Sequence, residues 1–172
     1  MKISFGDPER LSLCFASTEK REVWGYLHFR IKGELVSDSN EQMHITRFEA
    51  GLQRSMPYCG HRTLDYHDKG WPEVWYDLSV SYWGGEERHP ITKAGRYSVL
   101  NTEECFDFYR IFLVEEPEQG TETYLFGPTA RPPEESTEDL LRKVQIYTLP
   151  YGSYKDFVEA FSRELQGLGL DT

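Results

Sequence analysis

One segment of the sequence contains side chains that could bind a metal ion. The stretch CGHRTLDYH holds Cys59, His61, Asp65 and His67, which are all legitimate ligand types for zinc. A metal held there would support a small metal-dependent enzyme, which is one hypothesis for the function. The spacing fits no standard zinc site, and a polar loop after a helix is the simpler interpretation. We therefore predict no metal and no cofactor.

A second group that could do chemistry is the set of carboxylates Glu115, Glu116 and Glu118. Paired carboxylates act in general acid–base catalysis when burial or a neighbouring charge shifts their pKa values. These glutamates fall on an expected hairpin loop, where nothing would desolvate them. The sequence also has no glycine-rich phosphate loop, no G-x-S-x-G elbow and no H-E-x-x-H pair. It therefore predicts a protein that is not an enzyme.

The composition of the whole chain indicates one domain, spanning residues 1–172. With 38% hydrophobic and 15% aromatic residues, the chain can bury a core of its own. Cys14, Cys59 and Cys105 are too few and too scattered for a disulfide framework. The first residues lack the pattern of a signal peptide, and no stretch approaches the ~18 apolar residues of a membrane span. We expect a cytoplasmic protein without a membrane partner. The sequence leaves its oligomeric state undetermined.

The negative charge of the chain is concentrated in one region. The net charge is −10, and residues 103–139 contain 11 acidic and 2 basic residues, against 18 and 17 in the remainder. An acidic chain argues against nucleic acid as a partner. We interpret residues 115–139 as an acidic, proline-containing hairpin and loop region. It is either an ordinary solvated loop or a surface that attracts a basic partner.

The elements around these residues follow from hydrophobic spacing. Period-2 patterns and turn residues predict strands at residues 2–5, 11–16, 23–31, 95–100, 105–116, 121–127 and 142–149. Helical spacing predicts helices from Thr46 to Ser55 and from Ser153 to Gly167, each with a capped start. Residues 72–82 fit either a helix or a strand, and Pro72 favours the helix. The sum is an α+β domain, mainly antiparallel sheet, with two or three helices and the C-terminal helix packed on the sheet.

The predicted strand at residues 23–31 has two different faces. Val23, Gly25, Leu27, Phe29 and Ile31 form the core face. The other face carries Trp24, Tyr26, His28 and Arg30, and it could be exposed to solvent, packed under a helix or used for binding. A wider set of aromatic residues resembles the stacking sites of single-strand nucleic-acid binders, but such sites also need a basic groove. The set consists of Trp24, Tyr26, Trp71, Trp75, Tyr82 and Trp83, and core or interface packing is the favoured interpretation of it.

Several segments resemble the Imm42 family of bacterial immunity proteins. They are ISFGDPERLSLCF, WGYLHFRIKGE and ITRFEAGL, followed more loosely by FDFYRIFLVEE and VQIYTLPYGSYKDFVEAF. The specific part covers about the first 55 residues. The segment VWGYLHFRIKGELV predicts a hairpin with Lys32-Gly33 at its turn, where the family would have Asn-Gly. The sequence also differs in the long segment PTARPPEESTED. The resemblance implies binding and neutralising a cognate toxin of a polymorphic toxin system, with no catalytic residues.

The leading hypothesis from the sequence is therefore a stoichiometric toxin inhibitor that docks an acidic surface on a basic toxin domain. The residues expected to bind the partner are Glu115, Glu116, Glu118, Glu122, Tyr124, Glu134 and Glu135. The glutamates would steer association, and Tyr124 would supply an exposed aromatic anchor. The alternatives are the metal-dependent enzyme and a general protein-interaction module.

Overall fold

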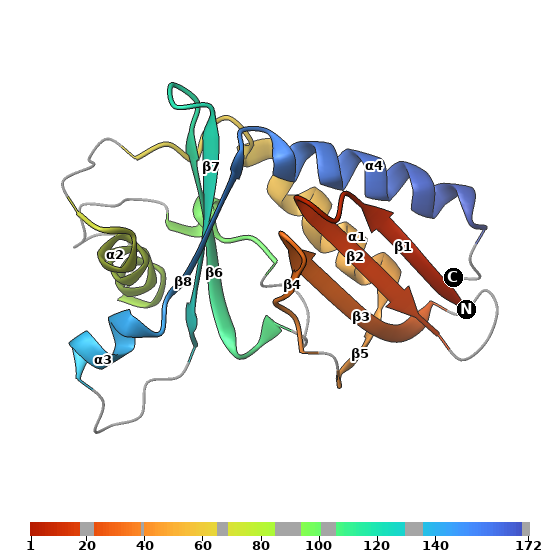
Figure 1. Ribbon diagram of the computed structural model, residues 1–172, viewed down its shortest axis with the longest axis horizontal. Coiled ribbons are helices and arrows are strands. Elements are labelled where there is room, and N and C mark those ends of the chain that lie inside the picture. Colours follow the sequence, from red (N-terminus) through yellow and green to blue (C-terminus); the bar gives the residue numbers. More distant parts are fainter. Residues whose placement is uncertain are drawn as a thin grey trace. The chain divides into compact units, whose positions relative to one another are not determined.

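The strands of the chain form two separate antiparallel sheets (Figure 1). The computed structural model describes residues 1–17, 23–38, 40–64, 69–84, 94–100, 106–129 and 136–169. The chain divides into two compact units. The first comprises Met1–Pro57, Thr102–Phe106 and Gly152–Thr172, and the second comprises Tyr58–Asn101 and Asp107–Tyr151. The predicted α+β class is confirmed. That residues 1–172 form one domain stays a prediction.

The first unit contains a sheet of five strands and two long helices. Its elements are β1 (Lys2–Gly6), β2 (Leu11–Ala16), β3 (Trp24–Ile31), β4 (Glu34–Leu35), β5 (Gln42–His44), α1 (Ile45–Ser55) and α4 (Ser153–Gly167), with the short 3₁₀ helix η1 (Met56–Tyr58) after α1. The sheet order is β1-β2-β3-β4, and β5 pairs with the other end of β3. Lys32 and Gly33, both with positive φ, form the two-residue turn between β3 and β4, as the sequence predicted.

Both helices of this unit cover the same face of the sheet. The ring of Phe29 in β3 lies 6.4 Å from that of Phe48 in α1 and 5.4 Å from that of Phe157 in α4. Phe161 of α4 in turn contacts Phe5 of β1. Aromatic pairs at these separations stabilise a core beyond the area that they bury. The C-terminal helix therefore packs on the sheet, as predicted, and it does so on the side formed by the inward residues of β1, β2 and β3.

The second unit contains a three-stranded sheet and two α-helices. Its elements are α2 (Trp71–Gly84), the 3₁₀ helix η3 (Ala94–Tyr97), β6 (Tyr109–Glu116), β7 (Thr121–Pro128), α3 (Thr137–Arg142) and β8 (Gln145–Pro150), and the strand order is β6-β7-β8. Trp75 of α2 is buried against this sheet, and its indole N–H donates to the carbonyl of Arg110 at 2.9 Å. A Cβ at Gly127 would lie 2.1 Å from the Trp75 ring, so the glycine allows this close packing.

Several local predictions are wrong. The strand expected at residues 95–100 is the helix η3 followed by one bridge between Ser98 and Phe112. Apolar residues on both faces of the segment 105–116 predict a central strand, yet β7 and not β6 is the central strand of its sheet. Part of the expected acidic loop is the helix α3, which Ser136 caps by accepting from the Asp139 amide at 3.1 Å.

The predicted caps of the two long helices are also wrong. The N-cap of α1 is His44, and that of α4 is Gly152 in a left-handed conformation. Neither N-cap makes a side-chain capping bond. The ambiguous segment is the helix α2, as Pro72 suggested. Within the described residues, no helix is long and apolar enough to span a membrane.

Candidate functional site

The predicted metal ligands are only partly placed by the structure. Cys59 and His61 are described, whereas Asp65 and His67 lie outside the described residues. In the part of the chain that is described, no three His, Cys, Asp or Glu side chains come together as a metal site would require. The Cys59 sulfur instead accepts a hydrogen bond from Arg62 at 3.4 Å. No described contact favours a metal-dependent enzyme.

Three of the four predicted partner-binding glutamates that the structure describes are buried. Glu115, Glu116 and Glu122 lie in the paired strands β6 and β7, where Glu115 is 4% exposed and Glu122 is 1% exposed. Tyr124 is fully buried. The expectation of an exposed acidic surface with an exposed tyrosine is therefore wrong at these positions, because the strands extend through the residues that were expected to form a loop. Whether any of them binds a partner stays a prediction.

A buried arginine accounts for the burial of Glu115. The Arg62 guanidinium is fully buried, and its Nη1 lies 3.2 Å from Glu115 Oε1. The backbone N–H of Arg62 donates to the other carboxylate oxygen at 3.2 Å, and the Glu115 N–H donates to the Arg62 carbonyl at 3.1 Å. Arg62 Nε also donates to the carbonyl of Arg96 at 2.9 Å. Such hydrogen-bonded pairing is what allows two charges to be desolvated together.

The other buried glutamates are hydrogen-bonded within the same hairpin. The hydroxyls of Thr121 and Thr123 donate to Glu116 at 3.3 and 3.5 Å. The hydroxyl of Tyr124 donates to Glu122 at 3.0 Å. These carboxylates are structural acceptors within the described hairpin, so they offer little charge to an approaching partner.

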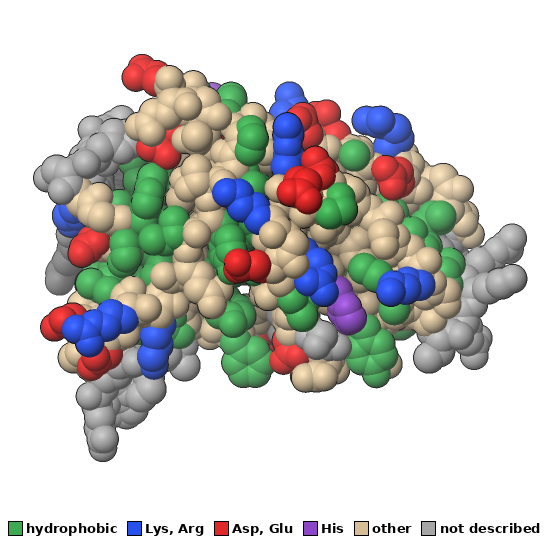
Figure 2. Space-filling view, viewed as in Figure 1, with side chains coloured by type: hydrophobic (Ala, Val, Ile, Leu, Met, Phe, Trp, Pro, Cys, Tyr) green, Lys and Arg blue, Asp and Glu red, His purple; other side chains and the backbone are tan. Residues whose placement is uncertain are grey.

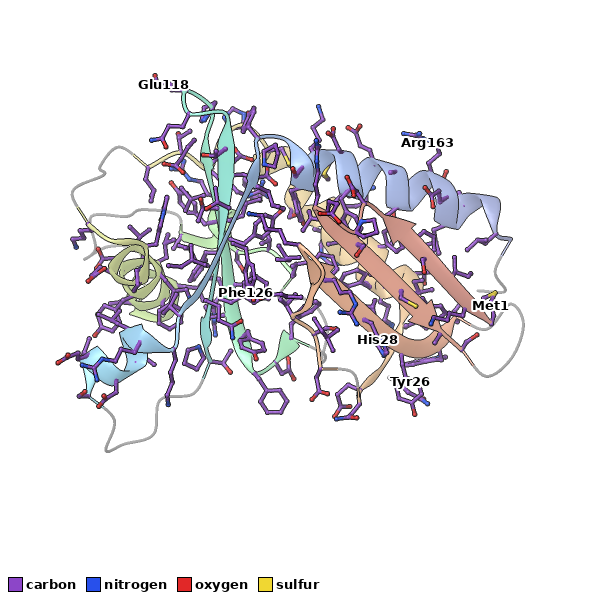
Figure 3. The ribbon with its side chains drawn as sticks, in the orientation of Figure 1. Met1, Tyr26, His28, Glu118, Phe126 and Arg163 are labelled. Carbon is purple, nitrogen blue, oxygen red and sulfur yellow. The ribbon has the colours of Figure 1, made fainter. Side chains whose placement is uncertain are left out.

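Glu118 is the predicted partner-binding glutamate that the structure places at the surface. It is exposed in the turn between β6 and β7, and Figure 3 shows it at the tip of the hairpin. Glu134 and Glu135 lie outside the described residues. The steering hypothesis therefore depends on these three glutamates alone, and it stays a prediction.

A different surface stands out on the first unit, on the side of its sheet opposite to α1 and α4. The strand register places three rows of side chains there. The rows are Ser12, Arg30 and Leu35; Ser4, Cys14 and His28; and Lys2, Ala16, Tyr26 and Gln42, with Trp24 beside His44 at the end. Cβ atoms of directly opposed residues lie about 4.5–5.5 Å apart. We call this set of residues the open face.

The open face presents aromatic groups to solvent. Trp24 is 49% exposed and Tyr26 is 37% exposed. Figure 3 shows Tyr26 and His28 close together on β3, and Figure 2 shows hydrophobic, histidine and basic side chains in the same region. Because Trp24 and Tyr26 are two residues apart on one strand, they point to the same side of the sheet. The register and the packing of Phe29 thus exclude one of the three interpretations of this face, since it is not packed under α1 or α4.

His44 ties the end of the open face to helix α1. Its ring meets that of Trp24 edge-on, with the centroids 5.2 Å apart, and its Nδ1 shares a hydrogen bond with the Thr46 hydroxyl at 2.8 Å. Desolvation, and then the positive charge of Arg47, lower the pKa of His44. The neutral imidazole is therefore favoured. The contact between His44 and Trp24 could not be predicted from the sequence, since residues 42–44 form a strand too short to detect.

The first unit also contains a cavity of about 310 Å³. It lies between the β1–β2 turn and α4, and its charged lining residues are Asp7, Arg10, Asp156 and Glu164. Arg10 forms an exposed ion pair with Asp7 at 3.8 Å. Exposed pairs of this kind contribute little to stability. The described lining residues therefore offer no desolvated acid–base pair for catalysis.

Comparison with known proteins gives a fold relationship. No protein-family model and no curated protein matches the sequence. Among solved structures, the chain is similar to CdiI from Burkholderia dolosa AUO158, with a TM-score of 0.65 and 17% sequence identity. The similarity covers 96% of this chain and 99% of that one. The two proteins therefore share a fold from end to end, and the Imm42 resemblance stays a prediction.

Proposed function

We propose that this protein is an immunity protein, which binds a cognate bacterial toxin and neutralises it by stoichiometric, non-catalytic inhibition. The observation that carries the proposal is the similarity to CdiI, a contact-dependent growth inhibition immunity protein, along nearly the whole of both chains. An inhibitor of this kind acts by covering a surface of its partner, so it requires no catalytic residues of its own.

The finer parts of the proposal concern the place of action and the partner. The protein would protect the cytoplasm of the cell that makes the toxin. Glu118, Glu134 and Glu135 would attract a toxin domain that is basic overall, because like charges concentrated in one region accelerate association with an oppositely charged partner. Nucleic acid and membranes would not be partners.

The proposal predicts that a gene beside this one encodes a toxin domain, and co-expression of that domain with this protein tests it. Cells that produce the toxin domain alone should stop growing, and cells that also produce this protein should grow. In a titration of the purified toxin domain, its activity should fall linearly and vanish near one equivalent of this protein. Inactivation by far less than one equivalent would indicate an enzyme, and the absence of both rescue and binding would contradict the proposal.

A further inference from the structure

The open face has the free surface and the residue types of a protein-binding site. The helices α1 and α4 pack on the opposite side of the sheet, through Phe29. Trp24 and Tyr26 remain substantially exposed, and Leu35 at the opposite end of the face is 42% exposed. Trp, Tyr and Arg are the residues most enriched among those that dominate the binding energy of protein interfaces. All three types occur here on the single strand β3.

The charge of the open face is opposite to that of the chain. Among its outward positions, the register places Lys2, Arg30, His28 and His44, and no Asp or Glu. The chain as a whole has a net charge of −10. A face without carboxylates on such an acidic protein can approach carboxylates of a partner without like-charge repulsion. Its permanently charged cations, Lys2 and Arg30, would then attract them.

We propose that the open face is the surface that docks the toxin, and that it receives a patch of the toxin that combines carboxylates with an apolar pocket for Trp24. This inference rests on the proposed function and adds the partner surface to it. The edge-on contact with His44 holds the Trp24 ring in one orientation before binding. Pre-ordering of an anchor side chain reduces the entropy lost on association. Arg30 is likewise oriented, since its Nη1 donates to the Gly33 carbonyl at 2.8 Å.

A protein partner fits the face better than a nucleic acid does. Two permanent cations would neutralise about two phosphates, which gives a salt dependence with a slope of only about −2 and correspondingly weak binding. The net charge of the chain adds repulsion. A carboxylate patch on a protein needs only a few cations, because the apolar contacts of Trp24 and Tyr26 supply most of the affinity.

The test measures the affinity of variants for the purified toxin domain encoded by the adjacent gene. Trp24→Ala should raise Kd about 30-fold or more, as for an anchor residue. Lys2→Glu leaves the core and the β3–β4 turn untouched, and it should raise Kd several-fold, because it places a carboxylate against the carboxylates of the docked patch. Phe108→Ala is the matched control, because Phe108 is 64% exposed in a turn of the second unit. It should change Kd less than threefold.

Each outcome decides the proposal. If the wild type binds the toxin domain and both open-face variants bind equally well, the docking proposal is wrong while the immunity function stands. If the wild type does not bind at all, both are wrong. The docking proposal would also be overturned if the wild type bound a labelled single-stranded RNA more tightly than the toxin domain. It would be overturned as well if the protein formed a dimer that Trp24→Ala converted to monomer. If Trp24→Ala unfolds, as circular dichroism would show, Lys2→Glu and Tyr26→Ser provide the same test.

Discussion

The β6–β7 hairpin and the open face on β3 use their polar and aromatic residues in opposite ways. The hairpin buries Glu115, Glu122 and Tyr124, although the surrounding sequence is the most acidic of the chain. The open face exposes Trp24 and Tyr26 on a strand whose other side is core. Residue type therefore does not decide exposure in either region. What decides it is whether another element lies against that side of the strand.

The largest expected effect tests whether Glu115 is structural. Glu115→Ala would leave the Arg62 guanidinium buried without its carboxylate, and loss of one partner of a buried pair costs about 3–5 kcal/mol. Urea unfolding followed by circular dichroism measures the change in the free energy of unfolding. Glu118→Ala on the same hairpin is the control, and its effect should stay within about 0.5 kcal/mol. Equal effects of the two variants would mean that the hairpin carboxylates are equally exposed in solution.

Replacing each of two tyrosines by phenylalanine has an intermediate expected effect on the free energy of unfolding. Tyr124→Phe removes the hydroxyl that donates to the buried Glu122, and loss of a hydrogen bond to a buried acceptor costs about 1–3 kcal/mol. Tyr26→Phe removes a hydroxyl from the open face and should cost less than about 0.5 kcal/mol. Both variants can be compared by the midpoint of urea unfolding. The contrast between the two regions would fail if Tyr26→Phe proved as destabilising as Tyr124→Phe.

The smallest effect concerns the contribution of His44, at the end of the open face, to the pH dependence of the free energy of unfolding. Its pKa is lowered from 6.5 in the folded protein, so the unfolded chain binds more protons as the pH falls below that value. The contribution of His44 to stability is therefore present above about pH 6.5 and is lost as the pH falls through the folded pKa. His44→Gln should reduce the difference between the unfolding midpoints at neutral and mildly acidic pH. An unchanged difference would assign the pH dependence to other groups.

Elements that depend on local pattern were predictable from the sequence. The C-terminal helix α4 was predicted over Ser153–Gly167 and packed on the sheet, and its Phe157 and Phe161 are buried. The alternation of Leu27, Phe29 and Ile31 correctly assigned the buried side of β3. In these cases the period of the hydrophobic residues contains the whole signal, because the helix or strand needs one apolar side to pack.

The burial of the hairpin could not be predicted in the same way. Glu115 is paired with Arg62, which lies 53 residues away in the sequence. No local pattern connects two residues at that separation, so a carboxylate near a turn looked solvated. The contact between His44 and Trp24 at the edge of the open face could not be predicted either, because it arises only from the pairing of β3 with β5. The alternation of β3 identified four residues of the open face, namely Trp24, Tyr26, His28 and Arg30. The residues that the other strands contribute to the face could not be identified from the sequence.

The alternation of β3 has a consequence for how such a protein can change over time. A Cβ at Gly25, between Trp24 and Tyr26, would lie 2.5 Å from the Ala16 carbonyl and 2.8 Å from the Phe15 ring. The inward positions of the strand are therefore intolerant of substitution, while their outward neighbours make few demands on the fold. Mutations at Trp24, Tyr26, His28 and Arg30 can accumulate without unfolding the protein. A lineage could in this way exchange one toxin specificity for another on an unaltered scaffold.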